Sequence, residues 1–139
     1  MFTRIALGFV CAALLAAVVV AEDKPDSEKI LGKWEVVSVQ RGGRALPDES
    51  LKALSFTFEK GKMIMHRGDQ KREFAMKLDP TKKPKAIDVD MMGKTGEGIY
   101  SLEGDSLKIC HGEEGDPRPT EMASKEGTQI SLITLKRAK

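Results

Sequence analysis

The chain has 139 residues, of which 32% are charged, and its 23 Lys and Arg residues nearly balance its 21 Asp and Glu residues. This balance argues against a general nucleic-acid or membrane-surface role, because both usually require a marked basic excess. A chain of this length has room for one domain with a packed core.

The N-terminal residues have the profile of a signal peptide. Residues 1–4 carry one positive charge, and residues 5–20 follow without a charged side chain. This apolar run is shorter than the ~20 residues of a membrane-spanning helix, and it ends at Ala21 in a small-residue cleavage pattern. We therefore predict a signal peptide over residues 1–21 and an exported protein, periplasmic or extracellular, with no stable membrane span after cleavage. An uncleaved N-terminal anchor is the alternative.

The start of the mature chain is charged and lacks periodicity. Residues 22–29 (EDKPDSEK) are typical of a short flexible lead, so order is expected from residue 30. Cys110 is the only cysteine that remains after cleavage, which excludes an intramolecular disulfide. Stability must therefore come from packing.

Period-two alternation of apolar and polar side chains predicts short β-strands along the rest of the chain. In chain order, strands are expected over residues 32–40, 54–59, 63–66, 73–78, 87–91, 99–102 and 106–110, with a short one at 120–124 and the last at 129–136. In the first of them, one face is expected to carry Trp34, Val36 and Ser38, and the other Val37 and Val39. Residues 93–98, which include three glycines, are expected to form a loop.

Short strands separated by turn signals, with no long helical period, indicate an all-β fold. The tight connections favour an up-and-down meander, and closure into a barrel removes the exposed strand edges that promote aggregation. We predict a small antiparallel up-and-down β-barrel, lipocalin-like, with about eight short strands over residues 30–139. A β-sandwich is the less favoured arrangement.

Several motifs are similar to those of a known family. Gly32-Lys33-Trp34 resembles the GxW signature of lipocalins. The wider pattern comprises ILGKWEVVS at 30–38, residues 43–51, residues 54–62, LDPTKKPKAIDV at 78–89, GIYSLEGDSLKIC at 98–110 and PRPTEMAS at 117–124. Together these segments resemble an uncharacterised lipocalin-like domain family that is abundant in Planctomycetes bacteria. The resemblance implies a small calycin-type barrel in an exported bacterial protein, but no activity or site residues, because the function of that family is unknown.

The inward-facing side chains of the predicted barrel are rich in aromatic residues and methionine. The candidate ligand-binding residues are Trp34, Phe56, Phe58, Met63, Met65, Phe74, Met76, Val89 and Met91, and Ile87 shares their face. Methionine adapts its shape and lines promiscuous apolar pockets. An eight-stranded barrel is just wide enough to be filled by its own side chains or to hold one small ligand. Given the large inward residues, a filled interior is the favoured expectation.

The sequence predicts no catalytic residue, metal site or cofactor. Cys110 and His111 are neighbours on one predicted strand, so their side chains point to opposite faces and cannot form a dyad. His66 is isolated, and no HxH, HExxH or CxxC spacing occurs. An enzyme is therefore the least favoured function.

Two functions remain from these observations. The leading hypothesis is an exported, non-enzymatic, lipocalin-like module whose partner is a small apolar ligand in the barrel, or a protein. The alternative is a structural or protein-interaction domain with a filled core and no ligand. No nucleic-acid partner is expected.

Overall fold

The structure of the protein is a computed structural model that describes residues 24–113 and 115–138. The predicted signal peptide, residues 1–21, lies outside the described residues. No helix in this part of the chain has the length and apolar character needed to cross a membrane.

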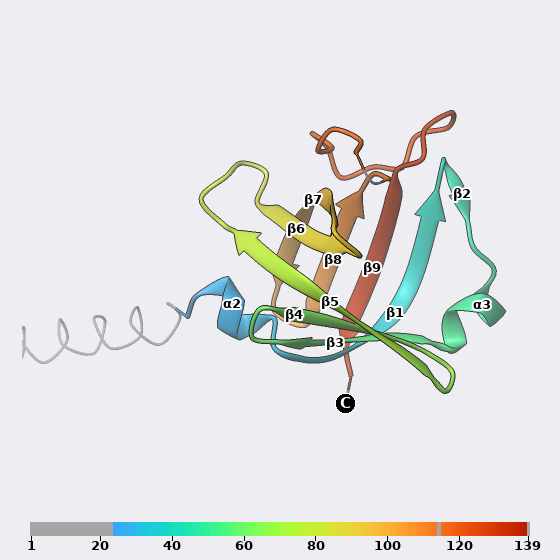
Figure 1. The fold of residues 1–139 in the computed structure, drawn as a ribbon. Helices are drawn as coiled ribbons and strands as arrows, with labels where there is room; N and C mark the ends of the chain where they lie inside the picture. Colours follow the sequence, from blue (N-terminus) through green and yellow to red (C-terminus); the bar gives the residue numbers. More distant parts are fainter. Residues whose placement is uncertain (1–23, 114, 139) are drawn as a thin grey trace, which may run out of the picture.

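The described residues form one antiparallel sheet that closes into a barrel (Figure 1). The strands are β1 (Gly32–Arg41), β2 (Arg44–Ala45), β3 (Leu54–Glu59), β4 (Lys62–Arg67), β5 (Gln70–Asp79), β6 (Ala86–Met91), β7 (Lys94–Glu103), β8 (Ser106–His111) and β9 (Ser131–Arg137). Each strand from β3 onward pairs with the next along the chain, and β1 pairs with both β3 and β9. The short β2 pairs only with the end of β1 and forms a two-stranded ribbon with it. The prediction of an all-β, up-and-down barrel of eight strands is confirmed.

Two predicted elements were wrong. Residues 94–98 belong to β7 rather than to a loop, because a two-residue turn at Met92 and Gly93 connects β6 directly to β7. Both turn residues have a positive φ, 56° and 91°, as a tight hairpin of this kind requires. Residues 120–124 form no strand and lie within the long connection between β8 and β9.

A β-bulge in β1 reverses the expected faces of its second half. Val36 pairs with Leu135, but Ser38 pairs with Thr134, so Val37 is an extra residue on β1. An extra residue shifts the alternation by one position. Val39 therefore faces inward, and the expectation that Ser38 shares a face with Trp34 is wrong. Val37 is 48% exposed.

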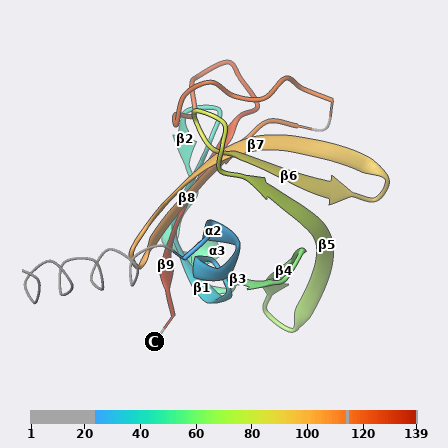
Figure 2. The same ribbon diagram turned by 90° about the vertical axis from the view of Figure 1, so that its left-hand side faces the viewer.

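One end of the barrel, called here the closed end, is covered by the short helix α2 (Asp26–Lys29). Figure 2 looks toward this end and shows the strands as a ring behind α2. The fully buried Trp34 donates a hydrogen bond from Nε1 to the carbonyl oxygen of Ile30 at 2.8 Å. The guanidinium of Arg137 lies 4.3 Å from the centre of the Trp34 ring and also donates to the carbonyl oxygens of Leu31 and Lys29. Trp34 and Arg137 thus attach the segment around α2 to the barrel.

Asp26 attaches α2 to the barrel. Its carboxylate is buried and accepts hydrogen bonds from the Tyr100 hydroxyl at 2.7 Å and from Lys85 Nζ at 2.8 Å. The expectation of a flexible lead over residues 22–29 is therefore wrong for residues 26–29. The sequence could not predict this burial, because the partners of Asp26 lie 59 and 74 positions away in the chain.

The pKa of Asp26 makes this anchor dependent on pH. Burial alone would raise that pKa, but the hydrogen bonds from Lys85 and Tyr100 outweigh burial and lower it below the ordinary value of 3.8. A carboxyl group whose pKa is lower in the folded than in the unfolded protein stabilises the fold. That stabilisation is complete when the pH is above the pKa of the unfolded state, and it is lost as the pH falls through the pKa of the folded state.

We expect Asp26→Ala to lower the free energy of unfolding by about 2 kcal/mol at neutral pH, since two hydrogen bonds to a buried charge are lost. The difference from wild type should shrink as the pH falls below about 4. Urea unfolding followed by the fluorescence of Trp34 measures both effects. Asp48→Ala is the matched control, because Asp48 also follows a proline in the short helix α3 (Asp48–Lys52) but is exposed. Equal destabilisation by the two variants would contradict this role of Asp26.

Candidate functional site

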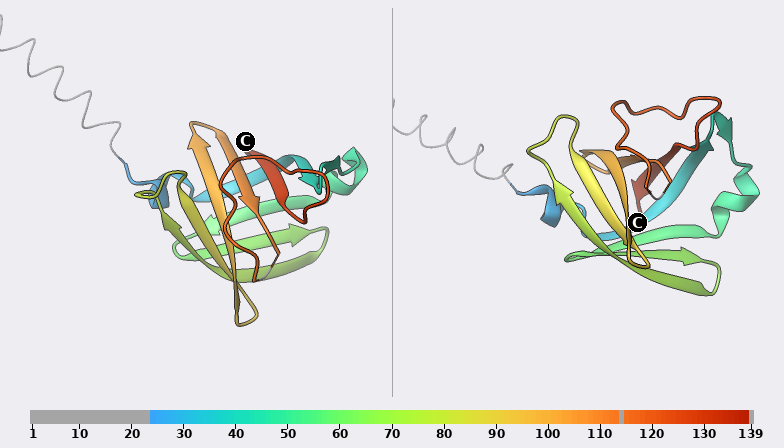
Figure 3. Two further views of the ribbon diagram at one scale, coloured as in Figure 1. Left: turned by 90° about the horizontal axis from the view of Figure 1, so that it is seen from above. Right: turned by 45° about the horizontal axis from the view of Figure 1, so that its top comes forward.

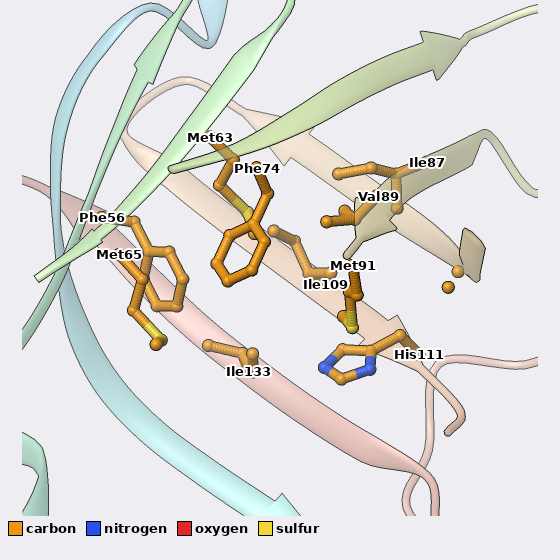
Figure 4. Close-up of a pocket in the computed structure, with 12 residues that line it drawn as sticks. Phe56, Met63, Met65, Phe74, Ile87, Val89, Met91, Ile109, His111 and Ile133 are labelled. Atoms are coloured by element: carbon orange, nitrogen blue, oxygen red, sulfur yellow. The ribbon is translucent and has the colours of Figure 1, made fainter. Parts of the chain in front are cut away.

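The barrel encloses an apolar chamber of about 270 Å³. It is lined by Phe56, Met63, Met65, Phe74, Ile87, Val89, Met91, Gly96, Gly98, Ile109, His111 and Ile133, and Figure 4 shows the labelled side chains around a common space. Along β8, Ile109 and His111 line the chamber, whereas Leu107 does not and is fully buried in the core. The expectation of a filled interior is therefore wrong for the half of the barrel away from α2.

Two glycines on β7 leave room for this chamber. Gly96 and Gly98 occupy inward-facing positions, because Tyr100 and Leu102 continue the same alternation into the core. A strand that lacks two successive inward side chains cannot fill the space in front of it. The chamber therefore exists because β7 has glycines at these two positions.

The two glycines differ in how much space surrounds them. A Cβ on Gly98 would lie 2.7 Å from the carbonyl oxygen of Cys110 and 3.0 Å from Cβ of His111. A Cβ on Gly96 would meet only the flexible end of Met91, at 3.3 Å, with other atoms at 3.7 Å or beyond. Gly98 is thus required by the close approach of β8, whereas Gly96 borders open space.

The structure brings most of the predicted candidates together. The candidates that line the chamber are Phe56, Met63, Met65, Phe74, Val89 and Met91. Trp34, Phe58 and Met76 lie outside it and belong to the packed hydrophobic core. Trp34 in particular is held at the closed end by Ile30 and Arg137.

The sequence prediction missed several lining residues. They are Gly96, Gly98, Ile109, His111 and Ile133. For the glycines a signal was available, because counting back from Tyr100 in steps of two reaches Gly98 and Gly96. The interpretation of residues 93–98 as a loop hid that signal.

His111 is the one lining side chain with an ionisable group. Its Nδ1 lies 3.0 Å from the carbonyl oxygen of Gly112. A carbonyl oxygen only accepts, so Nδ1 must donate its proton, and Nε2 of the neutral ring is then an acceptor. The chamber therefore offers a bound molecule mostly apolar contacts and at most one polar group.

Cys110 takes no part in the chamber. Its side chain is fully buried on the opposite face of β8, where Sγ lies 3.6 Å from the carbonyl oxygens of Glu121 and Ala123. Burial raises the pKa of the Cys110 thiol, which keeps it in the unreactive protonated form. The prediction that Cys110 and His111 point to opposite faces is confirmed. Among the described residues, no three His, Cys, Asp or Glu side chains gather closely enough to hold a metal ion.

The connection between β8 and β9 covers the outside of the barrel at Cys110. Arg118 attaches it, donating to the carbonyl oxygen of Gly98 and to the carboxylate of Asp88, both at 2.8 Å. The same connection reaches the β1–β2 ribbon, where the amide of Gly43 donates to Oγ of Ser124 at 3.0 Å (Figure 1). These contacts attach the connection to β6, to β7 and to the turn between β1 and β2.

Comparisons with known proteins give no match, whether with family models, with curated proteins or with solved structures. The closed eight-stranded barrel is compatible with a calycin-like fold. The lipocalin-like family named from the sequence motifs stays a prediction.

Alanine substitutions at the two glycines should separate the roles inferred for them. We expect Gly98→Ala to destabilise the protein by about 1–3 kcal/mol, because a Cβ there overpacks against backbone. Gly96→Ala should change the free energy of unfolding by less than about 1 kcal/mol. Met91 can move away from the new methyl group, and the lower conformational entropy of the unfolded chain offsets part of any strain. Urea unfolding of the two variants side by side measures the contrast. Equal effects would contradict the distinction between a tight and an open site.

Proposed function

We propose that this protein is an exported, non-enzymatic module that binds one small apolar molecule inside its barrel. The observation that carries the proposal is the apolar chamber of about 270 Å³ at the centre of the fold. Ligand sites are typically concave and mostly apolar, with few polar groups that orient the ligand. The signal-peptide profile of residues 1–21 supports export.

The size of the chamber limits the ligand to a short chain or a single small ring system. At about 30 Å³ for a group the size of a water molecule, the chamber accommodates roughly nine such groups. Each methylene moved out of water contributes about 0.8 kcal/mol, of which part is offset by the cost of immobilising the ligand. We therefore expect dissociation constants between about 1 µM and 1 mM for an eight-carbon chain.

The lining favours a class of ligands over one specific molecule. Met63, Met65 and Met91 contribute unbranched, polarizable side chains that adjust to different shapes. A single polar side chain, His111, offers little directional selection within the chamber. The alternative of an interaction domain with a filled core is less favoured, because such a domain has no need for open space beside Gly96.

Filling the chamber by substitution tests this proposal. Gly96→Val places a branched side chain in the open space, and we expect it to weaken the binding of 1-octanol at least tenfold (about 1.4 kcal/mol). Isothermal titration calorimetry measures the affinity, and wild type should show a negative heat-capacity change on binding. Thr95→Val is the matched control, because it adds valine to the neighbouring, exposed position of β7.

Two results would overturn the proposal. One is the absence of octanol binding to the wild-type protein at millimolar concentration. The other is undiminished binding by Gly96→Val, which would place the ligand outside the chamber.

A further inference from the structure

The acidic side chains of the barrel strands are confined to one face of the barrel wall. By strand register, the acidic residues of the barrel strands all face outward: Glu35, Glu59, Glu73, Asp79, Asp88, Asp90, Glu97 and Glu103. The inward positions at the end away from α2, called here the open end, carry Arg41, Arg67, Arg72 and Lys94. The whole chain is nearly neutral, so the composition does not explain an inner face without acidic residues.

Two of these cations stand directly beside the chamber. Arg72 is the cross-strand partner of Met65, a chamber-lining residue, so the two side chains share the inner face. Arg67 follows Met65 by two positions on β4 and therefore shares that face as well. Figure 3 shows the hairpin of β4 and β5 extending to the end of the barrel away from α2.

A second, polar hollow lies beside the chamber and is lined by these arginines. It has a volume of about 200 Å³ and is lined by Met65, Arg67, Gln70, Lys71 and Arg72. Met65 lines both spaces, so the apolar chamber and the cationic hollow are adjacent at this residue. A molecule that fills the chamber and extends past Met65 meets positive charge.

Arg67 and Arg72 are available to a ligand. Within residues 24–113 and 115–138, no carboxylate forms an ion pair with either side chain. Arg41 differs, because Glu113 is its partner. Both Arg67 and Arg72 are exposed, so neither side chain is enclosed by the packed core.

From this arrangement we propose that the molecule bound in the chamber is a single-chain carboxylic acid, with Arg67 and Arg72 binding its carboxylate at the open end. The inference rests on the proposed function and specifies its ligand class. The planar guanidinium matches the two oxygens of a carboxylate. The chamber holds roughly nine groups, which corresponds to a tail of about eight carbons. A cationic head group is repelled by the same side chains.

Three ligands of eight carbons each, with different head groups, test the inference by calorimetry. We expect octanoate to bind at least fivefold more tightly than 1-octanol, and octylammonium to bind most weakly. The expected preference is modest because exposed charge pairs are screened by water. Raising the salt concentration should weaken the binding of octanoate and leave that of octanol unchanged.

Variants assign the preference to the two arginines. Arg67→Gln combined with Arg72→Gln should reduce the affinity for octanoate to that for octanol, with octanol binding unchanged. The matched control is Lys77→Gln combined with Lys108→Gln, which removes two positive charges from exposed, outward-facing positions of β5 and β8. Thermal melting of both double variants checks that the fold is retained.

The outcomes distinguish this inference from the proposed function. If octanoate binds no better than octanol, or if the arginine variant keeps the preference, the carboxylate site is wrong while chamber binding stands. If the control variant loses the preference equally, overall charge is the cause and the site is wrong as well. If none of the three ligands binds to the wild-type protein, both proposals fail.

Discussion

The pairing of β1 with β9 is the interaction on which the rest of the structure depends. It joins the first and last strands of the meander, so that every strand except the short β2 has a partner on both sides and the sheet has a single inside. Closure removes the unpaired strand edges at which small β proteins aggregate. It also fixes which side chains share the interior, because residues from strands far apart in the sequence face one another across the ring. The bulge at Val37 is part of this closure, since it sets the inward face of β1 after Val36.

The two ends of the barrel are chemically different. At the closed end, Trp34 and Arg137 contact each other and the backbone at the end of α2, and the buried carboxylate of Asp26 on α2 accepts a hydrogen bond from Tyr100. At the open end, the inward-facing charges are basic, and Arg67 and Arg72 have no acidic partner among the described residues. If the proposed carboxylic acid binds here, its tail would lie toward the closed end and its carboxylate at the open end.

The chamber has a cost in stability that an occupant would offset. Atoms that line an empty space lack contacts on one side, so an open interior is less stable than a packed one. A ligand that binds only the folded state restores those contacts and raises the apparent stability. Gly96 is informative here, because the nearest atom to a Cβ at that position is the flexible end of Met91, at 3.3 Å.

The sequence by itself determined the strands from Leu54 to Met91 and the inward direction of Phe56, Met65, Phe74 and Val89, because alternation along a strand is a local property. It also determined that Cys110 and His111 are separated, for the same reason. Only the tertiary structure decided the burial of Asp26, the faces of β1 beyond Val36, and the presence of a chamber. Those features depend on partners far away in the chain. Whether inward side chains fill a barrel is set by how residues from several strands meet, and no single strand contains that information.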